Sequence, residues 1–363
     1  MQSLDNPFQN WGIKNIRRPL LIAGPCSAES EEQVLETARG LKEIGIEVFR
    51  AGIWKPRTRP NSFEGVGTIG LEWLKLVQKE FGMLTSTEVA NARHVEDALS
   101  AGVDILWIGA RTSANPFAMQ EIADALKGVD IPILVKNPVN PDVELWVGAI
   151  ERIMGAGITR LGAIHRGFSS FEKTRFRNVP QWQLAIDFRR KMPEIPMICD
   201  PSHISGCTEL IQEVSQKALD LNYDGLIIES HCNPPKAWSD AKQQLTPNEL
   251  RDMLSSLVLR IINVNPSLKT DLDEYRQQID KYDDDLLALL EERMKVAKLI
   301  GKYKKEHNMT ILQPSRWDEI IKKTVDKGAT FGLSEEFIST IFKAIHQESI
   351  NKQIQVMNDE EQK

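Results

Sequence analysis

The amino-acid sequence predicts an α/β fold, a (β/α)8 TIM barrel, followed by a smaller all-α domain. Short apolar runs rich in β-branched residues recur eight times in the first two-thirds of the chain, and amphipathic helix-like segments separate them. Strands that alternate with helices indicate a parallel sheet, because parallel pairing needs a crossover connection. Eight such units within about 250 residues are typical of a barrel. A doubly wound open sheet is the alternative.

The eight predicted strands are almost continuously apolar, as expected for strands buried on both faces. The helix after the eighth strand is expected over residues 246–264, with Thr246 as its N-cap and Pro247 at its first helical position. The strands are expected at residues 20–24, 47–52, 83–88, 105–111, 133–137, 160–167, 197–203 and 225–231.

The pattern changes after residue 270. Apolar residues then follow a 3-4 alternation from Leu272 to Tyr303, which is too long for a barrel helix and typical of a coiled or bundled helix. Two shorter helices are expected over about 314–327 and 334–357, separated by breaks at Gly328 and Gly332. We therefore assign residues 1–264 to the barrel, 265–269 to a linker, and 270–363 to an all-helical domain with a polar tail.

Composition excludes several classes of function. A net charge of −6 gives no sign of nucleic-acid affinity, and no apolar run approaches the ~18–20 residues of a membrane span. The N-terminus lacks the basic and apolar regions of a secretory signal. Four scattered cysteines do not form a disulfide framework at this length. We expect a cytoplasmic protein that binds neither nucleic acid nor membrane.

Polar residues at the predicted strand ends are the candidates for an active site, because barrel enzymes build theirs there. One set combines sulfur, nitrogen and oxygen donors that suit a divalent transition metal. Each member alone is more simply explained by packing, but four on one barrel face are hard to explain that way. The set is Cys26, His203, Glu229 and Asp240.

A second set at the same strand ends is cationic. Each cation alone has an ordinary explanation as the partner of a nearby acid, yet so many on one barrel mouth would repel one another unless anions bind there. Arg suits a bidentate grip on carboxylate or phosphate, and Lys can also transfer a proton. The set is Arg50, Lys55, Arg57, Arg111, Lys136 and Arg166.

The motifs IAGPCSAES, RAGIWKPRTRPNSFEG, IGAR, LVK, HRG, CDPSH and IIESHCNPPKAWSD resemble the 3-deoxy-D-arabino-heptulosonate 7-phosphate (DAHP) synthases of the type I-beta, barrel-only lineage. The resemblance covers about residues 15–262. It implies that Cys26, His203, Glu229 and Asp240 hold the metal, with manganese expected first and iron, cobalt or zinc as alternatives. It also implies phosphoenolpyruvate binding by Arg50, Lys55, Arg111, Lys136 and Arg166, and D-erythrose 4-phosphate binding by the KPRT stretch of Lys55, Pro56, Arg57 and Thr58.

In that family, carbon 3 of phosphoenolpyruvate attacks the aldehyde, water adds at carbon 2, and phosphate leaves. Lys55 is our candidate acid for the developing alkoxide. The K-P-R-T form argues against the related 3-deoxy-octulosonate 8-phosphate synthases, which remain the runner-up for the barrel. The sequence departs from the lineage at Arg59, at TSAN after GAR, and at His165.

The helical domain carries a charge inside its apolar seam. The 3-4 alternation predicts an apolar residue between Leu289 and Val296, but the residue there is Arg293. A charge in an apolar seam is costly unless an anion meets it. An intermolecular salt bridge or a register device is one explanation. Because Arg276, Lys304 and Arg316 lie near the same seam, a small dianionic ligand is the other.

The stretch LDEYRQQIDKYDDDLLALLEERMKVAKLIGKYKKEH resembles the AroQ-class chorismate mutases, which are all-helical dimers. The resemblance covers about residues 270–357 and implies a pericyclic rearrangement of chorismate to prephenate that needs only preorganised charge. It implies that Arg276 acts in the partner's site, so a homodimer is expected. Gln313 replaces a common Asp, and Trp317 replaces a Glu that often faces the substrate hydroxyl. The positions implied for the site are Arg276, Arg293, Lys304, Arg316, Ser349 and Gln353.

The sequence as a whole predicts a bifunctional shikimate-pathway enzyme, with a transferase barrel first and an isomerase domain last. The barrel carries no other regulatory domain, so we expect the helical domain also to sense prephenate or chorismate and inhibit the barrel. The alternative from another class is an octulosonate synthase barrel with a helical module that only dimerises and senses a ligand.

Overall fold

A computed structural model describes residues 7–14, 18–56, 63–260, 266–312 and 314–358. Side chains are described within these ranges except at 266–271 and 314–315. The chain divides into two compact units, Met1–Ile262 and Asn263–Lys363. Each unit is described by itself below.

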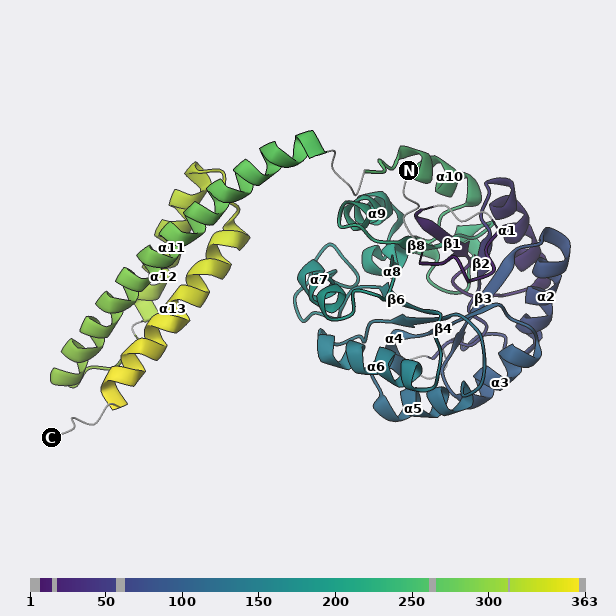
Figure 1. The fold of residues 1–363 in the computed structure, drawn as a ribbon, viewed down its shortest axis with the longest axis horizontal. Coiled ribbons are helices and arrows are strands. Elements are labelled where there is room, and N and C mark those ends of the chain that lie inside the picture. Colours follow the sequence, from purple (N-terminus) through teal and green to yellow (C-terminus); the bar gives the residue numbers. More distant parts are fainter. Residues whose placement is uncertain (1–6, 15–17, 57–62, 261–265, 313, 359–363) are drawn as a thin grey trace. The chain divides into compact units, whose positions relative to one another are not determined.

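The first unit is a closed barrel of eight parallel strands in the order β1 to β8, as predicted (Figure 1). The barrel closes where β1 pairs with β8, from Leu20 opposite Gly225 to Gly24 opposite Glu229. Closure rules out the doubly wound open sheet. The strands are β1 Leu20–Gly24, β2 Val48–Arg50, β3 Leu84–Val89, β4 Ile105–Ile108, β5 Ile133–Lys136, β6 Leu161–His165, β7 Met197–Cys199 and β8 Gly225–Glu229.

Helices surround the strands, and most begin with a side-chain cap that the sequence supplies. Ser30, Asn91, Asn115 and Asp142 each accept a hydrogen bond from a backbone N–H of the first turn that follows. The helices are α1 Glu31–Glu43, α2 Ile69–Phe81, α3 Ala92–Ser100, α4 Ala110–Ser113, α5 Pro116–Ala125, α6 Val143–Gly155, α7 Trp182–Lys191, α8 Pro201–Ser205, α9 Ile211–Asp220 and α10 Pro247–Ser256, with short 3-10 turns η1 Thr208–Leu210, η2 Pro234–Lys236 and η3 Ala241–Gln243.

The interior of the barrel is packed with side chains. Inward-facing residues such as Ile22, Trp107 and Ile227 form one buried cluster, and Phe8 and Trp11 from the N-terminal segment belong to it. A second, larger cluster fills the space between the strands and the surrounding helices. Because the barrel is filled, a substrate site has room only where the strands end and the loops begin.

α10 begins as predicted but is shorter than predicted. Thr246 and Glu249 form a reciprocal capping box at its start. The helix then ends at Ser256 and not near residue 264. Val258 exchanges two backbone hydrogen bonds with the side chain of Gln216 on α9, and this contact holds the chain extended where local pattern favours a helix.

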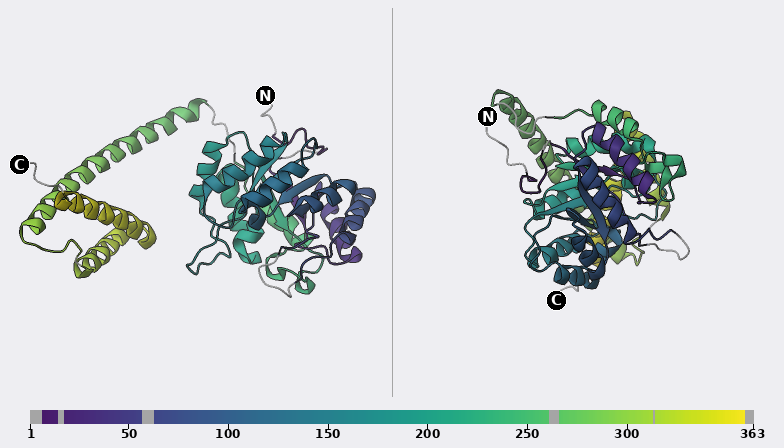
Figure 2. Two further views of the ribbon diagram at one scale, coloured as in Figure 1. Left: turned by 90° about the horizontal axis from the view of Figure 1, so that it is seen from below. Right: turned by 90° about the vertical axis from the view of Figure 1, so that its right-hand side faces the viewer.

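The second unit is a three-helix domain, as predicted: α11 Pro266–Glu306, α12 Pro314–Thr330 and α13 Glu335–Asn358. α11 has 41 residues against 24 in α13, and its first part extends beyond the other two helices (Figure 2). α11 begins at Pro266, inside the expected linker. Gly301 lets α11 approach α13 closely, because a Cβ there would lie 3.0 Å from the Cα of Gln353.

The predicted break at Gly328 is wrong, because α12 continues through it to Thr330. A Cβ at Gly328 would lie 2.6 Å from Cγ1 of Ile338, so this glycine serves the packing of α12 against α13. The chain turns instead at Gly332, whose φ is 74°. Among the described residues, no helix is both long enough and apolar enough to span a membrane.

Candidate active sites in the two domains

The predicted metal ligands come from three parts of the barrel's carboxyl-terminal face. Cys26 follows β1, Glu229 is the last residue of β8, and Asp240 directly precedes η3. One ligand atom from each of these three side chains lies within 4.8 Å of the others. The fourth, His203 in α8, contacts the group through Glu229, with 3.7 Å between Nε2 and Oε1. The structure thus brings three predicted ligands together and places His203 at their edge.

The two carboxylates of the set, Glu229 and Asp240, are charged although they are largely buried. Burial alone would raise the pKa of Glu229, but His203 and Arg50 lower it below its ordinary value. Burial would also raise the pKa of Asp240, and Arg177 lowers it well below the usual range. Burial, reinforced by Glu229, raises the pKa of the Cys26 thiol to about 12. Two carboxylates and a thiol in one small space therefore carry a negative field that a cation relieves.

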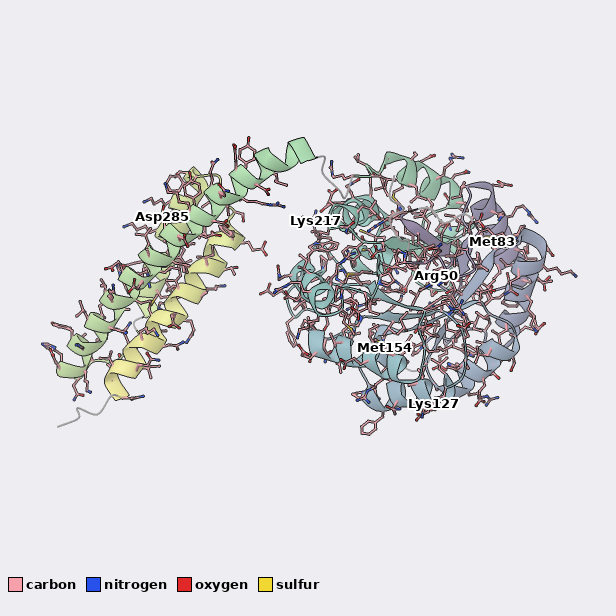
Figure 3. All side chains as sticks on the ribbon, in the orientation of Figure 1. Arg50, Met83, Lys127, Met154, Lys217 and Asp285 are labelled. Carbon is pink, nitrogen blue, oxygen red and sulfur yellow. The ribbon has the colours of Figure 1, made fainter. Side chains whose placement is uncertain are left out.

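Lys55 and Arg50 are the cations nearest to this cluster. Lys55 Nζ lies 3.0 Å from Cys26 Sγ. The Arg50 guanidinium, 1% exposed, donates to Glu229 Oε1 and to the Cys26 carbonyl, each at 3.2 Å. Its Cζ lies 4.8 Å from the centre of the Trp107 ring. Arg50 is thereby fixed inside the barrel mouth (Figure 3).

A second buried ion pair joins the end of β5 to Asp200, the residue that follows β7 and caps α8. Lys136, the last residue of β5, contacts Asp200 Oδ2 at 2.8 Å, and both side chains are buried. Asp200 also contacts Nδ1 of His203 at 2.8 Å. Burial would raise the pKa of Asp200, but His203 and Lys136 hold it well below its usual range. Asp200 therefore orients both a predicted substrate cation and a predicted metal ligand.

The remaining predicted cations lie on neighbouring loops. Arg166 follows β6 and donates to Asn178 Oδ1 at 2.6 Å. Burial lowers the pKa of Arg166 to about 10, so it stays charged at neutral pH. Arg111 lies in α4, just after β4, close enough to Arg166 to influence that pKa. Pro56 is described beside Lys55, whereas Arg57, Thr58 and Arg59 lie outside the described residues.

Sequence reasoning missed three side chains that support this cluster. Arg177 pairs with Asp240 at 3.0 Å, Gln243 donates to Glu229 Oε2 at 2.7 Å, and Gln244 accepts from the Cys26 N–H at 2.9 Å. All three come from long loops after β6 and β8. Their only signal in the sequence is position within a loop at the catalytic face, because neither a charge pattern nor a spacing singles them out.

The helical unit holds a cavity of about 360 Å³ between its three helices. Apolar side chains form much of its wall, and polar ones converge from all three helices. Five of the six residues predicted from sequence line it. The lining residues are Arg293, Val296, Ala297, Ile300, Lys304, Ile311, Arg316, Trp317, Ile320, His346, Ser349, Ile350 and Gln353.

Cations in this cavity are only partly paired with the protein. Arg293 donates to the Ser349 hydroxyl, and Lys304 to the carbonyl of Ile311. Burial lowers the pKa of both Arg293 and Lys304. Gln353 is 8% exposed, and its Oε1 has no hydrogen-bond partner among the described residues. This buried amide oxygen is available to a hydrogen-bond donor on a bound molecule.

Arg276 is the one predicted mutase residue that does not line this cavity. Its side chain is 61% exposed and pairs with Asp273 at 2.9 Å on the same helix. Arg316 lines the cavity and pairs with Glu319 at 2.9 Å. Trp317 also lines it, and Gln313 lies outside the described residues.

Comparison with known proteins gives one family for each unit. Residues 13–259 match the model of the DAHP synthetase I family, and residues 275–354 match that of chorismate mutase type II. The phospho-2-dehydro-3-deoxyheptonate aldolase of Thermotoga maritima is 35% identical over 240 residues, which cover 65% of this chain and 68% of that protein. The 2-dehydro-3-deoxyphosphooctonate aldolase of Paraburkholderia xenovorans is 26% identical over 74% of this chain and 97% of its own.

Solved structures agree with the synthase match. The crystal structure of the Thermotoga maritima phospho-2-dehydro-3-deoxyheptonate aldolase (DAHP synthase) is 32% identical, with a TM-score of 0.58 over 65% of this chain and 66% of its own. A truncated form of the 3-deoxy-D-arabino-heptulosonate 7-phosphate synthase from the same organism is 31% identical, with a TM-score of 0.56 over 65% of this chain and 83% of its own.

Proposed function

This chain belongs to the DAHP synthetase I family, and from that premise we propose that its barrel condenses phosphoenolpyruvate with D-erythrose 4-phosphate to DAHP and phosphate. We propose also that the helical domain rearranges chorismate to prephenate. The two family matches make the chain a bifunctional enzyme, a transferase followed by an isomerase. The proposed division is residues 1–264 for the synthase, 265–269 for the linker and 270–363 for the mutase.

The observation that carries the synthase proposal is the charge arrangement at the barrel mouth. Buried Arg50 and Lys136 and the charged Arg166 lie around a cluster of thiol and carboxylate groups. Phosphoenolpyruvate brings a phosphate and a carboxylate, which these cations neutralise. Lys55, beside Cys26, is placed to protonate the alkoxide that forms when carbon 3 of phosphoenolpyruvate attacks the aldehyde. Water then adds at carbon 2, and phosphate leaves.

The donor set fits a divalent transition metal. Cys26, Glu229 and Asp240 offer one thiol, which a bound metal would deprotonate, and two carboxylates within 4.8 Å, and His203 lies at the edge with an imidazole. We propose these four residues as the ligands, with manganese, iron, cobalt or zinc as the metal. When bound, such an ion supplies Lewis-acid polarisation of an aldehyde oxygen. Arg177 and Gln243 hold the two carboxylates in place.

The choice of aldose phosphate is tested by competition. The heptonate aldolase of Thermotoga maritima is 35% identical, against 26% for the octonate aldolase of Paraburkholderia xenovorans, and this difference favours erythrose 4-phosphate. We expect phosphoenolpyruvate consumption with erythrose 4-phosphate and not with arabinose 5-phosphate. The opposite preference would make the barrel an octulosonate synthase.

The helical cavity supports the mutase proposal. Arg293, Lys304 and Arg316 are suited to two carboxylates, and Lys304 and Gln353 to an ether oxygen. Nε2 of Gln353 is the atom that can donate to the ether oxygen, while its orphaned Oε1 is an acceptor and points to a hydrogen-bond donor on the ligand. A rearrangement within one molecule needs only such preorganised charge. Chorismate turnover by the full-length protein tests the proposal, and its absence would leave the domain as a ligand sensor.

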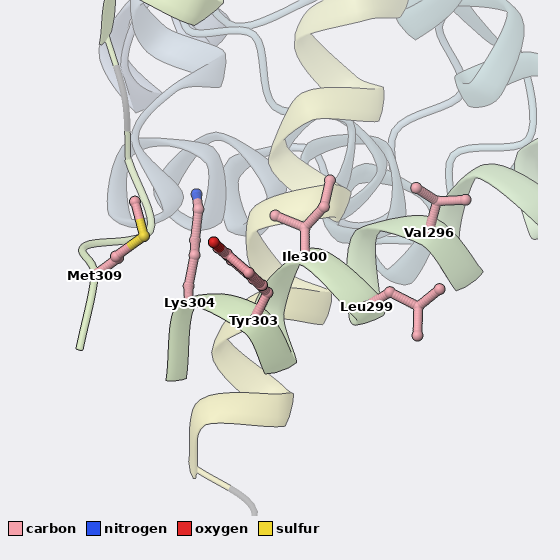
Figure 4. A pocket seen from close by; sticks show the side chains of 6 residues that line it. All are labelled: Val296, Leu299, Ile300, Tyr303, Lys304 and Met309. Atoms are coloured by element: carbon pink, nitrogen blue, oxygen red, sulfur yellow. The ribbon is translucent and has the colours of Figure 1, made fainter. Parts of the chain in front are cut away.

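We also propose a homodimer through α11. One side of this helix is apolar yet exposed, with Tyr282 67% and Leu289 69% exposed. A groove of about 460 Å³ lies further along α11 (Figure 4). It is lined by Val296, Leu299, Ile300, Tyr303, Lys304 and Met309. An exposed apolar stripe of this length is stabilised when it packs against another helix. The α11 helix of a second copy of the chain has the same 3-4 spacing and could pack against it. The exposed Arg276 would then enter the partner's cavity.

Prephenate is proposed as an inhibitor of the synthase. The rationale is that one chain carries both a synthase match, over residues 13–259, and a mutase match, over residues 275–354. Adding prephenate during the synthase assay tests this: unchanged activity at concentrations that saturate the mutase would reject it.

The four cysteines are all unpaired, which supports our proposal of a cytoplasmic location.

A further inference from the structure

His346 on α13 lines the mutase cavity, although no pattern in the sequence singles it out. Its ring stacks on the indole of Trp317 from α12, with 4.0 Å between ring centres and 22° between planes. No hydrogen bond joins its ring nitrogens to any residue that the structure describes. The imidazole is thus held by its face and keeps its two nitrogens for another partner.

The polar groups of the cavity can be matched one by one to a dicarboxylate with an ether and a ring hydroxyl. Arg293, Lys304 and Arg316, with the Ser349 hydroxyl, suit the carboxylates, and Nε2 of Gln353 suits the ether oxygen as a donor. The hydroxyl of the substrate remains. Among the described lining side chains, the uncharged groups left for a hydroxyl are the ring nitrogens of His346, the indole N–H of Trp317 and the acceptor Oε1 of Gln353. Of these, only the imidazole of His346 offers both a donor and an acceptor.

The charges around His346 keep it neutral at pH 7. Burial, and then Arg293 and Lys304 on α11, lower the pKa of His346 below its ordinary value of 6.5. Arg316 on α12 is the third cation at the cavity, and no carboxylate is among its described lining residues. A neutral imidazole donates through one nitrogen and accepts through the other. A hydroxyl can satisfy either, without placing a further charge in the pocket.

We propose that His346, held in place by its stacking on Trp317, hydrogen-bonds the ring hydroxyl of the mutase substrate and so determines specificity for the hydroxylated dicarboxylate. The proposal rests on the mutase function proposed above. In the resembling family a glutamate often faces this hydroxyl, and here Trp317 occupies its position. Trp317 has no carboxylate to contact the hydroxyl. In our proposal His346, on α13, makes this contact instead.

The test compares His346→Phe with the wild type in the full-length protein. Phenylalanine keeps an aromatic ring against Trp317 and removes the hydrogen bond. We expect kcat/KM for chorismate to fall roughly 3- to 10-fold, the range for one neutral hydrogen bond. For an analogue of chorismate without the hydroxyl, the same variant is expected to match the wild type within about 2-fold. His346→Gln, which keeps a donor and an acceptor, is expected to recover most of the loss on chorismate.

A matched control is His307→Phe. His307 stacks on Tyr303 at 4.1 Å in the same domain but does not line the Arg293–Gln353 cavity. This variant is expected to leave kcat/KM for both substrates unchanged. Circular dichroism of each variant checks that the helices are intact.

Proton linkage gives an independent readout. A bound dianion raises the pKa of His346, so affinity for prephenate is expected to rise as pH falls through that pKa. His346→Phe is expected to abolish this rise, measured by calorimetric titration of prephenate at several pH values between 5 and 8.

Three results would overturn this account at different levels. Absence of chorismate turnover in the wild type would overturn the mutase function, and the role of His346 with it. Wild-type turnover combined with an equal rate in His346→Phe on chorismate would leave the mutase function standing and overturn the role of His346. A loss in His346→Phe of the same size on both substrates would show a packing role only, and would also overturn the proposal.

Discussion

Removing Lys136 is expected to cost stability and activity by separable mechanisms. Lys136 Nζ lies 2.8 Å from Asp200 Oδ2, with side-chain exposures of 5% and 0%. In Lys136→Met, Asp200 keeps the backbone N–H and the imidazole of His203 as partners but loses its buried countercharge. Breaking a buried pair by removing one partner typically costs about 3–5 kcal/mol. We therefore expect the free energy of unfolding of the barrel to fall by that amount.

A second substitution isolates the charge. Asp200→Asn in the Lys136→Met background removes the uncompensated carboxylate, while the amide can still cap α8 by accepting from the His203 N–H. The double variant is expected to recover most of the lost stability, so the coupling energy from the four proteins should be roughly 3 kcal/mol. Phosphoenolpyruvate turnover should not recover, because the cation that grips the substrate is still missing.

Tryptophan fluorescence during urea unfolding provides the assay. Every tryptophan except Trp317 lies in the barrel, so the signal reports chiefly on that unit. Steady-state kinetics of each variant give the activity arm. A loss of less than about 1 kcal/mol in Lys136→Met, or a double variant no more stable than the single one, would refute the reasoning from uncompensated buried charge. Recovery of turnover in the double variant would refute the assignment of Lys136 to substrate binding.

Three further outcomes follow from other parts of the chain. Arg293→Ala is expected to lower kcat/KM for chorismate by at least about 100-fold in a coupled absorbance assay, because a charge-assisted contact to a carboxylate is lost in a buried site; a smaller effect would contradict its role. Leu289→Glu is expected to convert the dimer to a monomer in sedimentation, whereas an unchanged mass would contradict the α11 interface. His165 is buried and its pKa is lowered from 6.5 to about 4, so the unfolded chain binds its proton first as pH falls. Relative to His165→Asn, the wild type is expected to lose about 3 kcal/mol of stability between pH 7 and pH 4, and a pH-independent difference would contradict this.

The barrel was predictable because each of its elements is encoded locally. Eight apolar runs, helix caps such as Thr246 and the crossover requirement of parallel strands all agree on one fold. The end of α10 and the continuation of α12 through Gly328 were not predictable in this way. Both depend on tertiary contacts, of Val258 with Gln216 and of Gly328 with Ile338, that no local pattern records.

The residues of the candidate sites also fall into two groups: those that local sequence position predicts, and those that only tertiary structure brings to the site. Cys26, Arg50, Lys136 and Glu229 stand at or just after strand ends, so counting along the sequence places them at one face. Arg177 and Gln243 come from long loops whose path the sequence does not set, and they were missed. In the helical domain, Arg293 was found because it interrupts an apolar repeat. His346 interrupts no such repeat, and only the packing of α13 against α12 brings it to Trp317.

The central claim, a metal-assisted synthase at the barrel mouth, is tested most directly by one measurement. Phosphoenolpyruvate consumption with erythrose 4-phosphate is followed in the full-length protein, before and after treatment with a chelator and after readdition of manganese, with metal content measured in parallel. We predict turnover that the chelator abolishes and manganese restores, and a Cys26→Ser protein that retains less metal. Turnover that is unaffected in a protein shown to be free of metal, or no condensation under any condition, would contradict the account.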